Sequence, residues 1–213
     1  MRQVVGKKSK EISKNEFLSK IENYKKRVLD FGCGDGRFCY KNAIKNPHTF
    51  FVGIDPNEKQ LEKFSNKSMR EKIDNCLFLI ASDQTIPDEI FFEFDKIIIN
   101  FPWGTLLANI AAPNQIFYEN LKNLLRNKKG EIQIIFGHNP EFEPNHSKRL
   151  ELPEITKSYI EDTILPELRR LGFEISEFRL LYKDQINELE TTWARKLRFG
   201  MERDYFYLKL MIE

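Results

Sequence analysis

The segment Asp30–Arg37, which reads DFGCGDGR, decides the fold of this chain of 213 residues. The apolar run from Val28 to Phe31 predicts a short buried strand, and the pattern from Arg37 to Lys45 predicts a helix. Between them, glycines let the backbone turn tightly and approach a ligand closely. Their spacing is Gly-x-Gly-x-Gly, which differs from the Gly-x-Gly-x-x-Gly of dinucleotide-binding turns. The segment predicts a nucleotide-like site, although a plain strand–turn–helix with acidic caps is the simpler alternative.

The same alternation of strand and helix continues along the chain. Further strands are predicted at residues 50–54, 77–81, 96–100, 132–136, 173–181 and 205–212, and further helices at residues 58–69, 115–125 and 160–171. Such an alternation implies parallel strands joined by right-handed crossovers, and the apolar strands fit a sheet covered on both faces. We therefore expect an α/β fold with a seven-stranded, mostly parallel sheet whose last strand is antiparallel.

Three segments stand outside this alternation. Residues 1–12 are compatible with a short N-terminal hairpin. The connections at residues 138–155 and 182–203 are long for a compact α/β domain, and long connections often carry function. We expect one domain over residues 1–213, with this hairpin and two functional inserts.

The composition is that of a soluble globular protein, with 41% hydrophobic and 31% charged residues. The net charge of +2 says little about partners, so any basic surface must be local. Lysines interrupt the start of the chain, unlike a signal peptide, and no uncharged stretch is long enough to span a bilayer. The three cysteines form neither an even framework nor a zinc spacing. We expect reduced thiols, no metal, no membrane association and a cytoplasmic location.

Acidic residues near the glycine turn favour S-adenosylmethionine as the ligand. Asp55 ends the second predicted parallel strand, at the distance expected for a carboxylate that accepts hydrogen bonds from ribose hydroxyls. The carboxylate of Asp30 suits the ammonium and sulfonium of this cofactor and would repel a pyrophosphate. Small residues after the third strand leave room for adenine, whose edge Ser82 or Asp83 could bond. The predicted cofactor-binding residues are Asp30, Gly32, Gly34, Asp55, Pro56, Ala81 and Ser82.

The segment Asn100–Gly104 predicts the site of a target base. It follows the fourth strand, at the carboxyl edge of the sheet where doubly wound folds bind their ligands. It looks like the [Asn/Asp]-Pro-Pro-aromatic motif of amino-methyltransferases, with Phe101 in place of the first proline. In such a loop the ring of Trp103 would stack on a base extruded from its helix. The alternative is a core tryptophan, which its place between Pro102 and Gly104 argues against.

A second aromatic lies in the second long connection. Trp193 has four cations near it in the sequence: Arg195, Lys196, Arg198 and Arg203. Cations interleaved with an aromatic suit phosphate contacts and base stacking. The residues alone equally allow a short surface helix that buries Trp193 and Leu197.

Together these segments resemble the aminoglycoside-resistance methyltransferases of the kanamycin–apramycin type, which modify N-1 of adenine 1408 in 16S ribosomal RNA. The most specific likenesses are FPWGTLL at residues 101–107 and WAxxLxFG at residues 193–200. The resemblance implies a class I, Rossmann-like methyltransferase fold, S-adenosylmethionine as cofactor, and helix 44 of 16S rRNA in the 30S subunit as partner. It implies that two tryptophans sandwich the flipped adenine. The resemblance assigns the role of this catalytic pair to Trp103 and Trp193. It assigns Thr105, Leu106 and Thr191 to the pocket that holds the cofactor and the base.

Basic residues are predicted to hold the RNA. The cations at positions 59, 63, 67 and 70 fall near one face of a predicted helix, although a solvated face is the simpler alternative. By resemblance, Arg203 would hold RNA near the flipped nucleotide. Met201 stands where the family has an arginine, so Arg198 or Lys196 would take over that contact. The predicted RNA-binding residues are Lys67, Arg70, Arg195, Lys196 and Arg203.

The expected chemistry needs little from the protein beyond positioning. Neutral adenine N-1 carries a lone pair, so its attack on a sulfonium methyl requires neither a metal nor a strong base. We expect desolvation and stacking of the developing cation, with no essential general base and a monomeric enzyme. Two other methyl acceptors stay open: the exocyclic amine of adenine, which Asn100 would bond, and a guanine of transfer RNA. The alternative that is not an enzyme is an RNA-binding protein that has the cofactor-binding fold but does not catalyse methyl transfer.

Overall fold

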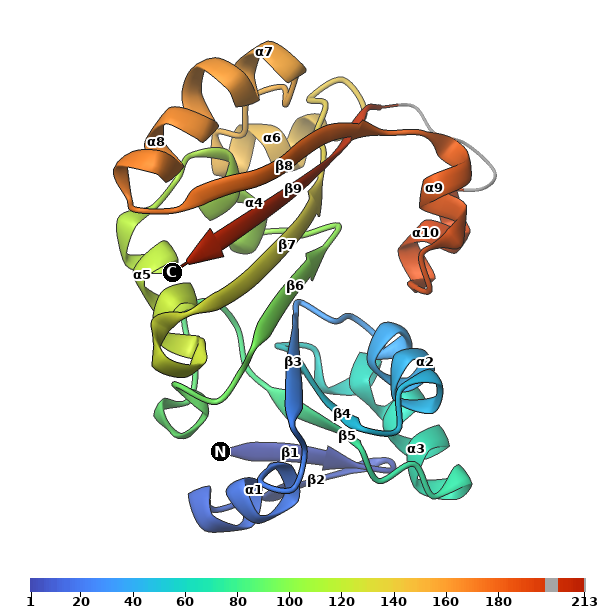
Figure 1. Cartoon of the computed structure of the whole chain (residues 1–213). Coiled ribbons are helices and arrows are strands. Elements are labelled where there is room, and N and C mark those ends of the chain that lie inside the picture. The colour runs from blue at the N-terminus through green and yellow to red at the C-terminus, as the bar shows by residue number, and fades with distance from the viewer. Residues whose placement is uncertain (198–202, 213) are drawn as a thin grey trace.

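A single twisted sheet runs through the molecule (Figure 1), seen in a computed structural model that describes residues 1–197 and 203–212. Its nine strands lie in the order β2-β1-β5-β4-β3-β6-β7-β9-β8. The parallel strands are β3 (Lys26–Phe31), β4 (Thr49–Asp55), β5 (Cys76–Ile80), β6 (Lys96–Asn100) and β7 (Gly130–Phe136). The order reverses at β3, and the carboxyl ends of β3 and its neighbours meet at one edge, where such sheets bind ligands.

The antiparallel strands flank this parallel centre. The hairpin of β1 (Arg2–Val5) and β2 (Lys8–Glu11) joins one side through β1, which pairs with β5. On the other side, β9 (Tyr205–Ile212) lies between β7 and β8 (Glu174–Leu181) and is antiparallel to both. The predicted antiparallel last strand is therefore confirmed. The predicted seven strands become nine because the N-terminal hairpin extends the sheet instead of standing apart from it.

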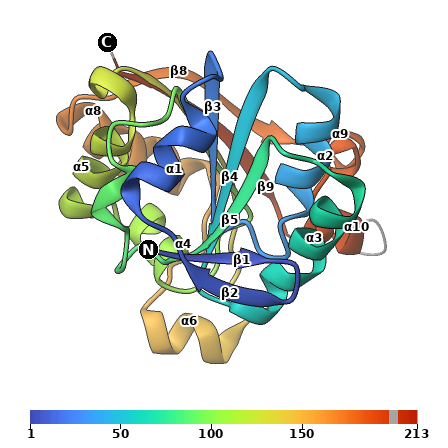
Figure 2. The same ribbon diagram turned by 90° about the horizontal axis from the view of Figure 1, so that it is seen from below.

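Helices cover both faces of the sheet. Seen from below (Figure 2), α5 and α8 lie on one side, and α2, α3, α9 and α10 lie on the other. The helices are α1 (Lys14–Ile21), α2 (Arg37–Lys45), α3 (Glu58–Glu71), α4 (Thr105–Ala111), α5 (Gln115–Leu124), α6 (Pro144–Leu150), α7 (Lys157–Tyr159), α8 (Leu165–Arg170), α9 (Lys183–Glu188) and α10 (Thr192–Leu197). The α/β fold expected from the sequence is confirmed.

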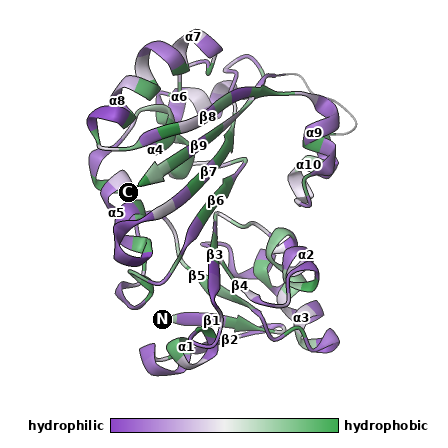
Figure 3. Ribbon diagram, in the orientation of Figure 1, coloured by the Kyte–Doolittle hydropathy of each residue, from purple (hydrophilic) through white to green (hydrophobic). Residues whose placement is uncertain are grey.

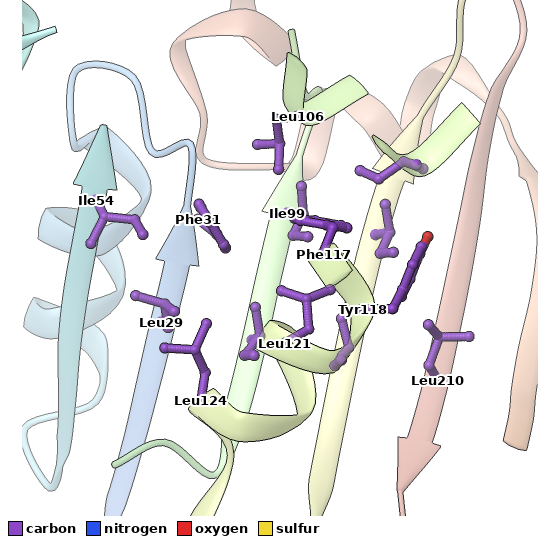
Figure 4. Close-up of a cluster of buried hydrophobic side chains, with 14 of the residues drawn as sticks. Leu29, Phe31, Ile54, Ile99, Leu106, Phe117, Tyr118, Leu121, Leu124 and Leu210 are labelled. Carbon is purple, nitrogen blue, oxygen red and sulfur yellow. The ribbon is translucent and has the colours of Figure 1, made fainter. Parts of the chain in front are cut away.

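The larger hydrophobic core lies between the sheet and α5 (Figure 4). Phe117, Leu121 and Leu124 of α5 pack against strand residues such as Leu29 and Ile99, all of them buried. Residues of one strand alternate between the two faces, so the neighbouring Ile98 belongs to the second core beneath α2 and α3. Hydrophobic residues follow the strands, and the outward sides of the helices are hydrophilic (Figure 3). No helix among the described residues is long and apolar enough to cross a bilayer.

The expected helix at residues 160–171 has different bounds and an internal irregularity. Helical backbone begins at Lys157 and ends at Arg170, with a π-helical turn at Ile160–Ile164 between α7 and α8. Pro166 follows this turn, and because its nitrogen carries no hydrogen it cannot complete the regular ladder.

The two long connections contain short helices. Helix α6 lies within residues 138–155, and α9 and α10 lie within residues 182–203.

Candidate functional site

The glycine-rich turn has the tight backbone that its sequence predicts. Gly32, Gly34 and Gly36 have φ angles of 75°, 58° and 79°, in the region that disfavours other residues. A Cβ at Gly36 would lie 2.3 Å from the ring of Phe78. The N–H of Gly32 donates to the carbonyl of Ile54 at 2.9 Å, which fixes the turn against β4. The glycines therefore hold the turn close to β4 and to the ring of Phe78.

The carboxyl edge of the sheet holds a cavity of about 870 Å³. Every residue predicted to bind the cofactor lines it, both tryptophans line it, and so does Lys196. The predicted residues brought together there are Asp30, Gly32, Gly34, Asp55, Pro56, Ala81, Ser82, Trp103, Thr105, Leu106, Thr191, Trp193 and Lys196. Residues far apart in the chain thus share one cavity, with the glycine turn on one side and the second long connection on the other. Their roles stay predictions.

Asp55 is oriented by the backbone around it. Its Oδ2 accepts a hydrogen bond of 2.9 Å from the N–H of Gly34, and its Oδ1 accepts one of 2.8 Å from the N–H of Asn57. Burial raises the pKa of this carboxyl, and the two N–H donors partly offset that rise. A carboxylate has further lone pairs beyond these two bonds, so Asp55 can still accept from two ribose hydroxyls.

Asp30 is the buried acid of the cavity. Its side chain is 2% exposed, and burial raises the pKa of the carboxyl to about 7. The thiol of Cys39, 3.6 Å from Oδ2, partly offsets this rise, and the carboxylates of Asp55 and Asp35 add to it. No cation among the described residues bonds Asp30, so an ammonium from a ligand would be the charge that favours its ionised form.

Two thiols lie next to this acid. Burial and the neighbouring Asp30 raise the pKa of the Cys33 and Cys39 thiols well above the usual range. These thiols therefore stay protonated at neutral pH, which excludes a thiolate nucleophile at this position.

Asp83 has a structural role that sequence reasoning missed. Its two carboxylate oxygens accept hydrogen bonds of 2.8 Å, one from the hydroxyl of Thr105 and one from the side-chain amide of Asn109. Both donors belong to α4, a helix that the sequence did not predict because it has seven residues and no side-chain cap. These bonds join the loop after β5 to the loop that carries Trp103, although Asp83 also lines the cavity.

Trp103 projects from the loop between β6 and α4. Its side chain is 51% exposed, which excludes the alternative of a core tryptophan. The neighbouring Phe101 has φ of 53°, and its N–H donates to the carbonyl of Ile135 at 2.7 Å. One face of the indole stacks on the imidazole of His146, with ring centroids 3.8 Å apart and an interplanar angle of 5°.

Trp193 reaches the same cavity from α10. The short surface helix considered from the sequence exists, but Ala194 is its buried residue, and Trp193 is 38% exposed. The indole Nε1 donates to the Tyr205 hydroxyl at 3.5 Å, and the Lys196 ammonium lies 5.4 Å from the ring centroid. The two exposed indoles therefore belong to one cavity that also contains the glycine turn.

The family model that describes 16S rRNA (adenine(1408)-N(1))-methyltransferases matches residues 2–212. This chain belongs to that family. A 16S rRNA (adenine(1408)-N(1))-methyltransferase of Escherichia coli is 32% identical over 206 residues, which cover 94% of each protein. A solved structure of a 30S ribosomal A1408 methyltransferase from an uncultured bacterium matches over 100% of both chains, with 37% identity and a TM-score of 0.79. The solved structure of the 16S rRNA methyltransferase KamB also matches over 100% of both chains, with 28% identity and a TM-score of 0.87. The chain is thus an S-adenosylmethionine-dependent rRNA methyltransferase, as its sequence predicted.

The predicted RNA contacts of this methyltransferase lie outside the cavity except for Lys196. Lys67 and Arg70 are exposed on α3, where the Lys67 ammonium lies 3.7 Å from the carboxylate of Glu71. Arg195 is exposed on α10. Two further positions that bear on this prediction, Arg198 and Met201, lie outside the described residues.

Arg203 lies against α6. Its guanidinium donates to Oε1 of Glu143 at 2.7 Å, and its side chain is 14% exposed. It borders a second, smaller cavity of about 320 Å³. The structure thus places this arginine in an ion pair, and its predicted contact with RNA stays a prediction.

One group of side chains within residues 1–197 and 203–212 has the composition of a metal site. His138, Glu143 and His146 bring three potential ligand atoms within 4.8 Å of one another. Glu143 is already bound by the guanidinium of Arg203, and a fixed cation there opposes a second one. That the enzyme uses no metal therefore stays a prediction.

Proposed function

We propose that this chain transfers a methyl group from S-adenosylmethionine to N-1 of adenine 1408 in helix 44 of 16S rRNA, within the 30S subunit, and so confers aminoglycoside resistance. The observation that carries the proposal is the single cavity that the glycine turn, Trp103 and Trp193 share. A cofactor site and two exposed indoles in one cavity are what the methylation of a flipped base requires. The full-length match to the family supports the choice of base.

The residues of the cavity fit S-adenosylmethionine. Buried Asp30 has no cationic partner among the described residues, and the cofactor's ammonium would supply one. Asp55 would accept from the ribose hydroxyls, and Ala81 and Ser82 leave room for adenine. The cofactor contributes an electrophilic methyl group on its sulfonium, and positioning the acceptor is the task of the protein.

Two indoles would hold the acceptor. Trp103 and Trp193 each offer an exposed ring face to the cavity, and stacking of one base on one aromatic is worth about 1–3 kcal/mol. This stacking offsets the few kcal/mol needed to extrude the adenine from its helix. As N-1 gains the methyl group the ring becomes cationic, and the indole faces stabilise that charge.

The protein groups around the acceptor need not remove a proton. N-1 of adenine attacks through its lone pair, so no general base takes part in the transfer. The Lys196 ammonium lies over Trp193, where it would contact the phosphate of the flipped nucleotide. Arg195, Arg203, Lys67 and Arg70 would contact phosphates farther out. The inserts at 138–155 and 182–203 form part of the docking surface of a monomeric, cytoplasmic enzyme that uses no metal.

Methylation of the exocyclic amine of adenine is the second candidate, and Asn100 is the residue that favours it. Asn100 lines the cavity, and its Nδ2 is buried with no hydrogen-bond partner among the described residues. An unsatisfied amide at this position would be free to orient toward the base edge. Reverse transcription distinguishes the two products, since 1-methyladenine stops reverse transcriptase and N-6-methyladenine does not.

Primer extension across helix 44 tests the proposal. Purified 30S subunits are incubated with the protein, with and without S-adenosylmethionine, and we expect a cofactor-dependent stop at adenine 1408. Labelled methyl incorporated without a stop at that position would refute methylation at N-1 of adenine 1408, and would leave the exocyclic amine or another base as the acceptor. No incorporation into subunits, naked 16S rRNA or transfer RNA, with cofactor binding intact, would favour a binding-only protein.

A further inference from the structure

Trp103 receives little support from its own loop. Half of its side chain is exposed, and Gly104 beside it has φ of 64° with nothing within 4 Å of the place where a Cβ would be. Helix α4 begins at Thr105 without a side-chain cap. A large ring on such a loop has several rotamers open to it, and fixing one costs free energy at the moment of binding.

The support comes from another part of the chain. The imidazole of His146 lies parallel to the indole, at 3.8 Å between centroids and 5° between planes. His146 is 8% exposed and is absent from the described residues that line the cavity, whereas Trp103 is among them. The imidazole therefore covers the indole face turned away from the cavity, and the opposite face stays open toward it.

His146 is held by its helix and not by hydrogen bonds to its ring. Its neighbour Ser147 bonds Nε2 of His138 at 2.8 Å, and the N–H of Ile155 donates to the carbonyl of His138 at 2.9 Å. Both ring nitrogens of His146 are buried without a hydrogen-bond partner in the part of the chain that the structure describes. An unsatisfied buried polar group costs about 1–3 kcal/mol, so hydrogen bonding does not explain why a histidine occupies position 146. Its flat face is the feature in contact.

We propose that His146 is a positioning residue, which backs Trp103 and holds the indole plane where the target base stacks on its open face. The proposal rests on the proposed function in taking the base as the occupant of that face. The insert at residues 138–155 then influences methyl transfer through the contact between the imidazole of His146 and the indole of Trp103. With the indole fixed before RNA arrives, ordering it costs nothing further during base capture.

Two substitutions at position 146 distinguish the effect of a planar ring from the effect of side-chain volume. His146→Phe keeps a planar ring of similar size, and His146→Leu fills the space without a plane. We expect the Leu variant to lower kcat for methylation of 30S subunits about tenfold, with the KM for S-adenosylmethionine unchanged, and the Phe variant to stay within about twofold. His48→Leu is the matched control, because His48 is exposed and distant from the cavity residues.

A spectroscopic arm tests the same contact without RNA. In a Trp193→Phe background Trp103 is the one remaining tryptophan, and the time-resolved anisotropy of its emission reports local rotation. We expect slow rotation with His or Phe at position 146 and faster rotation with Leu. Unchanged rotation in the Leu variant, or equal losses of kcat in the Leu and Phe variants, would overturn the proposal. Failure of the proposed function would instead appear as unmethylated 30S subunits with the wild-type enzyme, and the anisotropy would still decide the role of His146.

Discussion

The hydroxyl of Thr192 donates a hydrogen bond of 2.8 Å to Oδ2 of Asp35, across 157 positions of sequence. Asp35 belongs to the glycine-rich turn, and Thr192 begins the helix that carries Trp193. The same carboxylate oxygen accepts from the ammonium of Lys63 at 2.9 Å. One carboxylate thus joins the predicted cofactor half of the cavity to the predicted base half.

Breaking this link should impair RNA methylation more than cofactor binding. Thr192→Val keeps the shape of the side chain and removes the hydroxyl, so we expect kcat/KM for 30S subunits to fall about threefold to tenfold, as for one hydrogen bond. Thr192→Ser, which retains the hydroxyl, should stay close to wild type. Steady-state methylation with both variants checks this, and a fully active Val variant would show that the bond is incidental.

Affinity for S-adenosylmethionine should rise with pH. The Asp30 carboxyl has a pKa of about 7 in the free protein, so it is largely protonated at pH 6. The ammonium of the cofactor favours the ionised form, and binding therefore releases a proton. We expect affinity to increase about fivefold to tenfold between about pH 6 and pH 7.5. Calorimetric titration measures this, and adenosine, which lacks the ammonium, should show no such increase. Equal affinity for the cofactor at both pH values would contradict the assignment.

Asp30→Asn should stabilise the free enzyme at high pH. The folded-state pKa of Asp30 lies above the ordinary value of 3.8 for this group, so Asp30 makes the folded state progressively less stable as pH rises from that value to about 7. An amide of the same shape does not ionise. We expect the variant to have a higher Tm than wild type at about pH 8, a small difference at about pH 4, and weaker cofactor binding throughout. Thermal unfolding at both pH values checks the sign, which would be reversed if Asp30 were stabilised by a hidden cation.

The two tryptophans should matter for RNA and not for the cofactor. We expect Trp103→Ala and Trp193→Ala each to lower the methylation rate of 30S subunits about tenfold to a hundredfold, with phenylalanine variants in between. Affinity for S-adenosylmethionine should change less than about twofold. Phe92→Ala is a matched control, because Phe92 is also 51% exposed but precedes β6, at the opposite end of that strand. A tryptophan variant that lost cofactor binding as well would point to a structural role.

Charge reversal on α3 should weaken docking. Lys67→Glu with Arg70→Glu removes two cations that we predict to lie near phosphates, and each lost contact reduces the salt dependence of binding. Binding to 30S subunits at several salt concentrations should show lower affinity and a shallower slope. Lys157→Glu with Arg169→Glu, on exposed positions of α7 and α8, is the control with the same charge change. Unchanged binding by the α3 variant would identify its cations as a solvated face.

Sequence patterns were sufficient for the elements that have long runs of one periodicity. The bounds of α2, β6 and β9 are those predicted, because each has clear apolar spacing. The glycine turn, Asp30 near the end of β3 and Asp55 at the end of β4 were found in the same way, since their spacing along the chain is local.

The remaining features depend on contacts between distant segments. Helices α4 and α6 have seven residues each, too few to establish a period, and α6 has no side-chain cap either. The pairs Thr192–Asp35, Arg203–Glu143 and His146–Trp103 are formed by tertiary packing, and no local motif signals them. Sequence could therefore predict which residues would gather at the cavity, but not which neighbours would hold them in place.

The place of β9 in the sheet has a consequence for genetics. Strand β9 lies between β7 and β8, so it is an interior strand although it is formed by residues 205–212. A premature stop codon after residue 204 would leave β8 without a partner strand, uncover β7, and remove the hydroxyl of Tyr205 that meets Trp193. Nonsense and frameshift alleles that remove β9 should therefore be null. In a deep mutational scan, a stop codon at position 205 should be as damaging as a stop codon within β3.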